Sequence, residues 1–234
     1  MNTNPAATLW LIAYEQVTVK TYTCLLRDIL GWSNLSHYVM GGTSTIERAR
    51  STIASGFLKK DEGDVLLMVD HDVQWEQGDL QYIARKALER KAIVGGLYPM
   101  RTFAKGMSSR LDEKGAFKFV TDTLVKARYL AGGFLAITKN VLEAISKTLP
   151  LVHSDKDDYW PFFQQMIVTN KFKCGELTEF LTEDWALCHR ARGCGQKVLA
   201  AFKPRLKHEG TYNYRMVDAR SQPLPDEDVT LTLN

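Results

Sequence analysis

The stretch LLMVDHDVQWEQGDL, residues 66–80, joins the strongest apolar run of the chain to two aspartates that are one residue apart. A short, uninterrupted apolar run of this kind is typical of a buried parallel strand. In an extended chain residues i and i+2 point to the same side, so Asp70 and Asp72 are expected to face one site and His71 to turn away. The pair fits an acidic turn that closes a strand. It also fits a divalent-cation site, because a cation offsets the repulsion between two carboxylates.

Segments typical of strands and of helices alternate around this run. Four strands are expected in the first hundred residues, at 9–14, 37–42, 64–70 and 91–99. Each of the first three is followed by a segment whose apolar residues have helical spacing. Such alternation predicts a single α/β domain with a Rossmann-like, mostly parallel sheet that is flanked by helices.

The second half of the chain is less regular. Residues 102–120 are typical of a mobile loop with a short hairpin arm, and the tail after Tyr214 is polar. Residues 128–138 (RYLAGGFLAIT) indicate a strand that two glycines interrupt, and residues 182–195 indicate a helix that ends at glycine. These segments are expected to complete the domain rather than to form a second one.

Composition and charge exclude few classes of function. The chain has 234 residues, of which 45% are hydrophobic and 24% charged, so it can bury a sizeable core. Its formal net charge of +3 is too small to indicate a nucleic-acid-binding protein by itself. No stretch approaches the roughly 18 apolar residues of a membrane span, and the first residues lack the basic start of a signal peptide. We expect a cytoplasmic protein without membrane insertion.

An acidic pair, Glu183 and Asp184, lies at the start of the predicted helix at 182–195. Acidic residues in a first helical turn complement the helix dipole and need no other role. A carboxylate at that position is equally suited to remove a proton from an acceptor hydroxyl as a general base. The residues alone do not separate these two interpretations.

Several further residues have both a structural and a functional interpretation. His208 lies among Lys203, Arg205 and Lys207, a basic group suited to phosphate, and its imidazole would be a third metal ligand that favours manganese. The remaining candidates are two glycines that form a bulge or admit a substrate, two arginines that bind a diphosphate or face solvent, and aromatic residues that stack on a sugar or pack. They are Gly132, Gly133, Arg48, Arg50, Trp75, Tyr159 and Trp160.

The order of these motifs resembles the glycosyltransferase A fold, and most closely small family-2-like glycosyltransferases, including those encoded by phages. LLMVDHDVQW is similar to the strand and D-x-D element that holds a divalent cation on the diphosphate of a nucleotide sugar. AIVGGLYPMR resembles the strand that follows it, and YLAGGFLAI resembles the acceptor-side segment. LTEDWALCHRARGCG resembles the helix that supplies the catalytic base of inverting members.

The resemblance implies a hexosyl- or pentosyltransferase with a catalytic domain at about 1–215, a nucleotide-sugar half up to about 100, an acceptor half from about 101, and a tail at 216–234. It implies Mn²⁺ or Mg²⁺ as the cofactor and a host-cytoplasmic location if the protein is viral. The implied metal ligands are Asp70, Asp72 and His208, and the implied base is Asp184, with Glu183 as second choice. The implied donor contacts are Ala13, Tyr14, Arg48, Asp70 and His71, and the acceptor contacts are Gly132, Gly133, Tyr159 and Trp160. Arg101, Lys105 and Arg110 of the loop at 100–115 are expected to close over the donor.

Three alternatives compete with this function. A sugar-nucleotide pyrophosphorylase is expected to have a glycine-rich basic loop after its first strand, which AYEQVTVK does not provide, and a D-x-D-x-T phosphatase requires threonine where Gln74 stands. A non-catalytic nucleic-acid-binding module would bind through KPRLK, residues 203–207, and the loop at 101–110. The acceptor itself is unknown; a hydroxymethylated base in phage DNA is one candidate that would use both the basic residues and a catalytic site.

Overall fold

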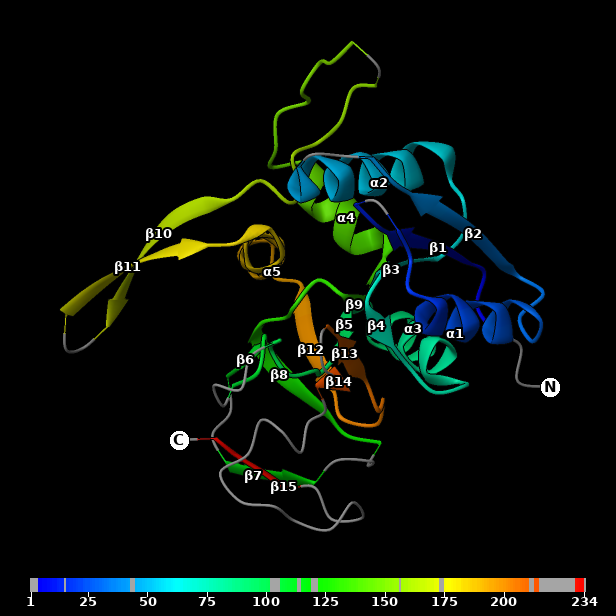
Figure 1. The fold of residues 1–234 in the computed structure, drawn as a ribbon. Coiled ribbons are helices and arrows are strands. Elements are labelled where there is room, and N and C mark those ends of the chain that lie inside the picture. The colour runs from blue at the N-terminus through cyan, green and yellow to red at the C-terminus, as the bar shows by residue number, and fades with distance from the viewer. Residues whose placement is uncertain are drawn as a thin grey trace.

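A mixed eight-stranded sheet forms the centre of the protein, with the strand order β2–β1–β3–β9–β5–β12–β8–β6 (Figure 1). This computed structural model describes residues 4–14, 16–42, 45–101, 106–112, 115–118, 122–155, 157–172, 175–210, 213–214 and 230–233. The strands of the sheet are β1 (Ala7–Ile12), β2 (Leu35–Met40), β3 (Val65–Asp70), β5 (Ala92–Gly96), β6 (Arg110–Leu111), β8 (Leu124–Tyr129), β9 (Phe134–Thr138) and β12 (Lys197–Ala201). β2, β1 and β3 are parallel, as are β5 and β12, whereas β9 lies antiparallel between β3 and β5.

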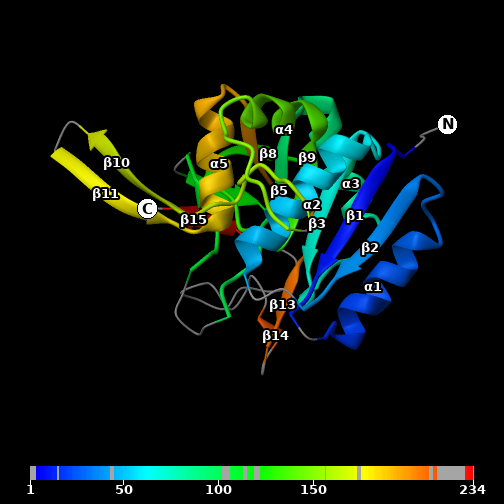
Figure 2. The ribbon, with the colours of Figure 1, turned by 90° about the horizontal axis from the view of Figure 1, so that it is seen from above.

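Helices cover both faces of this sheet (Figure 2). Those within the described residues are α1 (Val19–Ile29), α2 (Ile46–Lys60), α3 (Asp79–Arg90), α4 (Lys139–Ser146) and α5 (Glu183–Gly193). The apolar residues of α1 and α3 belong to one buried cluster, and those of α2, α4 and α5 belong to another. The sheet therefore separates two cores, as a Rossmann-like α/β domain requires.

β3 lies between the two cores and explains why its sequence is apolar throughout. Leu66 and Met68 point into the core under α2, α4 and α5, whereas Val65, Leu67 and Val69 point into the core under α1 and α3. All five side chains are fully buried. A strand that is buried on both faces reads as a continuous apolar run rather than an alternating one, so the prediction of a central buried strand is confirmed.

The alternation of strands and helices in the first hundred residues is confirmed, but the second half differs from expectation in two ways. Residues 128–138 do not form one interrupted strand: β8 ends at Tyr129, the chain turns, and β9 begins at Phe134 on the other side of β5 and β12. A hairpin of β10 (Met166–Phe172) and β11 (Gly175–Leu181), which the sequence analysis missed, projects from the body as an arm (Figure 2).

Two small sheets complete the structure. β13 (Lys207–Glu209) lies between β4 (Val73–Gln74) and β14 (Asn213–Tyr214), and β7 (Gly115–Lys118) pairs with β15 (Thr230–Leu233). Apart from β15, the expected polar tail at 216–234 lies outside the described residues, as does Lys105. Among the described helices, none has both the length and the apolar character needed to cross a membrane.

Candidate functional site

A cavity of about 620 Å³ opens where β1 and β3 end. The carboxyl ends of parallel strands are the usual place for ligands in an open α/β sheet. Most of the residues selected from the sequence meet here, although they come from distant parts of the chain. Those that line the cavity are Ala13, Tyr14, Arg50, Asp70, His71, Asp72, Arg101, Gly132, Glu183, Asp184 and His208.

His71 was expected to turn away from Asp70 and Asp72, but it lines the same cavity as they do. β3 ends at Asp70, and the chain turns at His71 and Asp72, so the alternation of an extended strand does not continue. All three side chains consequently line the same cavity.

Pairing between β4 and β13 brings Asp72 and His208 together across 136 positions of sequence. His208 is the register partner of Val73, and the amide of Glu209 donates a 2.7 Å hydrogen bond to the carbonyl oxygen of Asp72. As a result, Nε2 of His208 lies 3.6 Å from Oδ2 of Asp72. Nη1 of Arg101 lies 2.7 Å from the same Oδ2 and forms an ion pair with it, and the side chain of Arg101 is half-exposed.

The role of Nε2 of His208 toward Asp72 depends on whether the ring is neutral or protonated. Nδ1 lies 3.1 Å from the carbonyl oxygen of Pro99. A carbonyl only accepts, so we infer that Nδ1 carries the proton. In the neutral ring Nε2 then directs a lone pair toward a carboxylate, an arrangement that a cation between them would stabilise. Burial raises the pKa of Asp72, but a hydrogen bond from the protonated ring of His208, together with the charges of that ring and of Arg101, outweighs burial and holds this pKa below its usual value.

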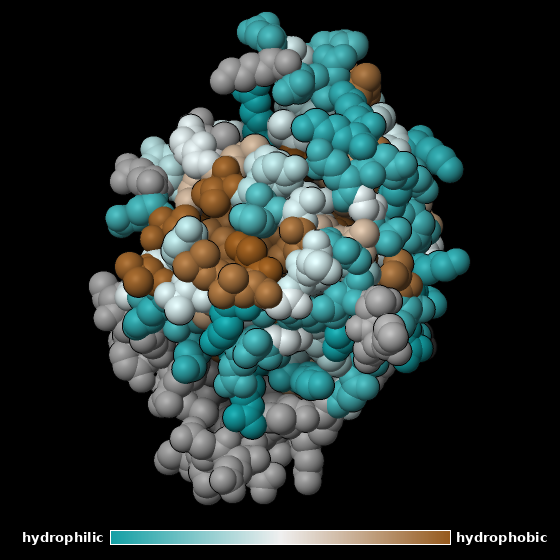
Figure 3. Space-filling view, turned by 90° about the vertical axis from the view of Figure 1, so that its right-hand side faces the viewer, coloured by the Kyte–Doolittle hydropathy of each residue, from teal (hydrophilic) through white to brown (hydrophobic). Residues whose placement is uncertain are grey.

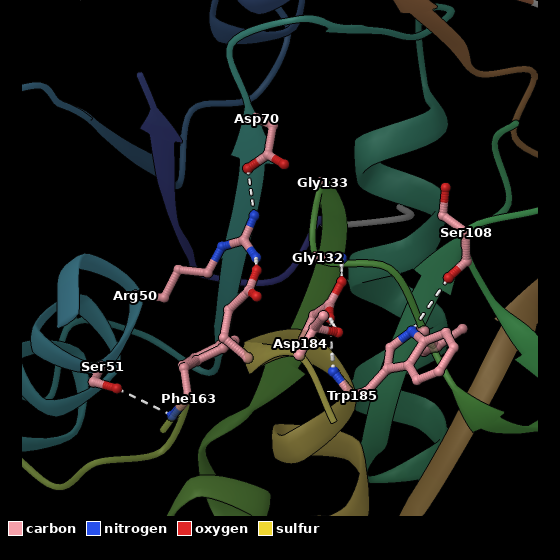
Figure 4. Close-up of polar contacts among 12 residues, drawn as sticks. Arg50, Ser51, Asp70, Ser108, Gly132, Gly133, Phe163, Asp184 and Trp185 are labelled. Atoms are coloured by element: carbon pink, nitrogen blue, oxygen red, sulfur yellow. Dashed lines mark hydrogen bonds and ion pairs between the residues drawn. The ribbon is translucent and has the colours of Figure 1, made fainter. Parts of the chain in front are cut away.

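Arg50 occupies the centre of the site and joins its two sides (Figure 4). Its guanidinium lies 2.6 Å from Oδ1 of Asp70 at the end of β3, and 2.6 Å from Oε1 of Glu183 in the first turn of α5. The side chain is only 3% exposed. A buried arginine with two carboxylate partners therefore links the D-x-D segment to the acidic helix.

The charges of this group shift one another's pKa values. Burial lowers the pKa of Arg50, but the carboxylates of Asp70, Glu183 and Asp184 raise it well above its ordinary value, so the guanidinium stays charged. Burial raises the pKa of Glu183, and the neighbouring Arg50 offsets only part of that rise. The site thus contains a permanent positive charge beside a carboxylate of increased basicity.

Asp184 fixes the turn before β9. Its Oδ2 accepts a 2.9 Å hydrogen bond from the amide of Gly132, while Oδ1 accepts hydrogen bonds from Thr182 and from the amide of Trp185 (Figure 4). A Cβ atom on Gly132 would lie 2.1 Å from a guanidinium nitrogen of Arg50, so only glycine fits here. The close approach that this glycine permits is to Arg50, whereas an approach of its backbone to a substrate stays a prediction.

Tyr98 is a site residue that the sequence analysis did not select. Its hydroxyl accepts a 2.7 Å hydrogen bond from the amide of Gly133, and its ring meets that of His208 edge-on at 5.1 Å. A Cβ atom on Gly133 would lie 2.6 Å from this hydroxyl and 3.0 Å from Asp70, which explains the second glycine. The sequence offered one signal for Tyr98, namely its position just before Pro99 at the end of the predicted strand at 91–99.

Four predicted contact residues lie away from the cavity. Arg48 is exposed on α2, whereas Arg50, two residues later, is the arginine that faces inward. The amide of Trp160 donates a hydrogen bond to the hydroxyl of Ser55 on α2, and Tyr159 pairs with Val152, so both aromatic residues lie in a loop away from the residues that line the cavity. Gly133 lies behind the cavity wall at Tyr98 rather than on its surface.

The described residues contain no cluster of three His, Cys, Asp or Glu side chains arranged to hold a metal. Asp72 and His208 form a pair, whereas Asp70 is engaged by Arg50. A pair is sufficient for one class of site, because Mg²⁺ is usually bound by one or two carboxylates together with substrate phosphates. The donor set of Asp72 and His208 fits a divalent cation that shares its coordination with a diphosphate.

No family model and no curated protein matches this chain. Among solved structures, A197 from STIV is similar over 87% of this chain and 85% of its own, with 17% identity and a TM-score of 0.55. S. aureus TarS 1–349 is similar over 90% of this chain and 60% of its own (10% identity, TM-score 0.49), and an apo UDP-glucose pyrophosphorylase over 75% and 59% (9% identity, TM-score 0.39). At these identities the likeness concerns the α/β fold.

Proposed function

We propose that this protein is a metal-dependent glycosyltransferase of the glycosyltransferase A type, which moves a sugar from a nucleotide sugar to an acceptor hydroxyl with inversion. The observation that carries the proposal is the meeting, in one cavity at the ends of β1 and β3, of the D-x-D segment, His208 and the acidic start of α5. The order of motifs in the sequence, which resembles such enzymes, supports the same conclusion.

The donor half of the cavity would bind the diphosphate. Asp72 and His208 would hold Mn²⁺ or Mg²⁺, with Asp70 as the further ligand that the sequence predicts. A bound cation neutralises the charge that develops on the departing nucleoside diphosphate. Arg101, which contacts Asp72 from the mouth of the cavity, supplies a further positive charge and can move because its side chain is half-exposed.

The acceptor half would supply the base. As the acceptor oxygen forms its bond to the anomeric carbon, the bond from that carbon to the diphosphate oxygen breaks, and the hydroxyl proton passes to Asp184. The amide of Gly132 and the hydroxyl of Thr182 orient this carboxylate. Glu183 is the second candidate for the base, but it is paired with Arg50 at 2.6 Å and is better placed to hold Arg50 between the two halves.

A hydroxymethylated base in DNA remains the specific candidate acceptor. Lys203 and Arg205, just before β13, and Lys207, its first residue, are exposed, and His208 of the same strand lines the cavity. If these cations contact phosphates, the affinity for duplex DNA should fall steeply as salt rises. Duplex binding that is absent, or that does not respond to salt, would remove DNA as the acceptor and leave the transferase proposal intact.

A thermal-shift screen of nucleoside diphosphates and nucleotide sugars, each with and without Mn²⁺, tests the donor site. A ligand that binds only the folded state raises the melting temperature by mass action. We expect a rise that requires both metal and nucleotide and that disappears in Asp72→Asn. Asp157→Asn, a change in a loop remote from the cavity, should respond as the parent protein does. No rise with any pair would refute the proposal.

The base is tested with the nucleotide sugar that the screen identifies. Asp184→Asn should lower the turnover number by about 10²–10⁴, the usual contribution of a general base, while the nucleotide-induced shift remains. Glu183→Gln should retain more activity than Asp184→Asn. The opposite order of the two variants would transfer the role of base to Glu183.

A further inference from the structure

A row of exposed apolar side chains follows the solvent side of α1. Its members, which we call the α1 stripe, are Val19, Tyr22, Leu26 and Leu30. They are spaced by three or four positions, the spacing that places residues on one side of a helix and that forms the seam between paired helices. Leu30 is 90% exposed, whereas Thr21 and Asp28 on the inner side of the same helix are fully buried. The apolar stripe of α1 therefore points to solvent.

β2, beside α1, is an unprotected edge of the sheet. Among the described strands it pairs only with β1, in even register along all six residues. Its four central residues, 36–39, are exposed. Natural edge strands are usually protected by lysine, proline, inward-pointing charges or bulges. The sequence LSHYVM of β2 contains no lysine, aspartate, glutamate or proline, and within the described residues no strand pairs with its outer edge.

The stripe and the edge strand lie on the same side of the molecule. Figure 3 faces this side and shows apolar side chains gathered in one patch, and Figure 2 shows α1 running beside β2. With Val39 of β2, the α1 stripe exposes on the order of 500 Å² of apolar surface, near the upper end of the roughly 300–600 Å² expected for the largest patch of a monomer. Patches of this size commonly mark interaction surfaces.

We propose that the α1 stripe and β2 form an interface with a second copy of this chain, related by a two-fold axis between the two β2 strands. A two-fold axis perpendicular to the sheet makes the two β2 strands antiparallel and joins the two sheets into one. It also places the two α1 helices side by side, because each covers the same face next to its edge strand. The interface is self-complementary, as two-fold symmetry requires.

A second copy would cover both the α1 stripe and the edge of β2, whereas a lipid surface would cover only the stripe. A lipid surface would cover the stripe but would leave the backbone groups of the β2 edge without partners in an apolar medium, which is costly. A standard interface buries about 800 Å² on each partner. The apolar patch supplies the core of such an area, and antiparallel pairing of β2 with β2 supplies the polar remainder.

The proposed dimer leaves the cavities independent. The cavity lies at the carboxyl ends of β1 and β3, which are parallel to β2. Because the two-fold axis reverses the strands, the two cavities would open at opposite ends of the joined sheet. A variant that separates the copies should therefore bind nucleotide as the parent protein does.

Sedimentation equilibrium of the full chain tests the proposal. We expect a concentration-dependent mass of twice 26.5 kDa for the parent. Leu30→Glu combined with Val39→Lys should be monomeric, because each copy would place charges in an apolar seam. Leu88→Glu, a change at an apolar residue of α3 with similar exposure to Leu26, should dimerise as the parent does.

Two results would overturn this interface. One is a parent chain that stays monomeric at every concentration, and the other is a dimer that the Leu30→Glu and Val39→Lys changes leave unaltered. Flotation with vesicles of phosphatidylcholine and phosphatidylglycerol separates the lipid alternative. A monomeric parent that floats, and that stops floating in Leu30→Glu, would assign the α1 stripe to a membrane surface instead.

Discussion

The cavity and the α1–β2 face depart in opposite ways from the usual distribution of polar and apolar residues. At the cavity, Arg50 is buried between Asp70 and Glu183. At the other face, Leu30 and Val19 are exposed to solvent. Buried charge is costly unless it is paired, and an exposed apolar patch near the upper end of the range for monomers commonly marks an interaction surface. Each departure needs compensation, which the chain itself supplies at the cavity and which a second copy would supply at the α1–β2 face.

The comparison also separates two kinds of energetic consequence. Removing Arg50 from the cavity leaves its partly buried carboxylate partners without their cation, so both stability and binding should suffer. Changing an exposed leucine of the α1 stripe leaves nothing unpaired in the single chain, so only association should change. Four changes, ordered from the largest expected effect to the smallest, test whether this distinction holds.

Arg50→Met should lower the free energy of unfolding by about 3–5 kcal/mol, because it removes the buried cation that pairs with the partly buried carboxylates of Asp70 and Glu183. Urea denaturation followed by circular dichroism measures the effect. Arg48→Met, two residues away on the exposed side of α2, should change it by no more than about 0.5 kcal/mol. Equal losses of unfolding free energy in the two variants would show that the ion pairs of Arg50 do not stabilise the fold.

Asp79 is a buried carboxylate that accepts hydrogen bonds from the backbone amides of Glu76 and Arg205. Burial raises its pKa to about 6. A raised pKa means that the folded state binds the proton more tightly, so this group's stabilising contribution is present below about pH 4 and is lost as the pH rises to about 6. Two pKa units correspond to about 3 kcal/mol.

Asp79→Asn should abolish the loss of stability that the ionisation of Asp79 causes as the pH rises. The difference in unfolding free energy between the variant and the parent should therefore shift in the variant's favour by about 3 kcal/mol between pH 4 and pH 7. Urea titrations at several pH values measure it. A constant difference across this range would mean that Asp79 titrates normally in the folded protein.

Gly132→Ala should cost about 1–3 kcal/mol, the usual range for an overpacked site, because its Cβ would overlap the guanidinium of Arg50. Gly56→Ala provides the matched control: it lies within α2, nothing is within 4 Å of the added atom, and the change should stabilise by about 0.5–1 kcal/mol. Thermal melts of the two variants should shift in opposite directions, and a shift in the same direction would contradict the packing described around Arg50.

Leu30→Glu has the smallest expected effect on the single chain. At a dilution where the parent is monomeric, its unfolding free energy should change by no more than about 0.5 kcal/mol, since the side chain contacts little in the folded protein. Urea denaturation at the lowest detectable concentration measures it. A loss above about 1 kcal/mol would show that Leu30 is part of the chain's own core.

The sequence predicted those parts of the fold and site that depend on local pattern. The apolar run before Asp70 predicted the buried strand, and the acidic pair predicted the first turn of α5. Contacts between distant segments were not predictable in the same way. That His208 pairs beside Asp72, and that Arg50 rather than Arg48 turns inward, depends on strand pairing and on the rotation of α2 against the sheet.

The missed features share a physical cause. The arm of β10 and β11 carries exposed apolar residues such as Ile167 and Phe180 in a mixed pattern, which indicates no clear buried face. The turn at Leu130–Gly133 looked like part of a strand because its residues are apolar and buried on both sides. Tertiary burial, rather than local propensity, decides such segments.

Calorimetric titration of the nucleoside diphosphate selected by the thermal screen, with and without Mn²⁺, tests the central claim that the cavity binds a diphosphate through a cation at Asp72 and His208. Sharing of one cation predicts positive coupling between the two ligands. We expect at least about tenfold tighter nucleotide binding with Mn²⁺, a coupling of about 1.4 kcal/mol, and loss of this gain in both Asp72→Asn and His208→Ala. Equal affinities with and without the metal, or a gain that survives in both variants, would contradict the account.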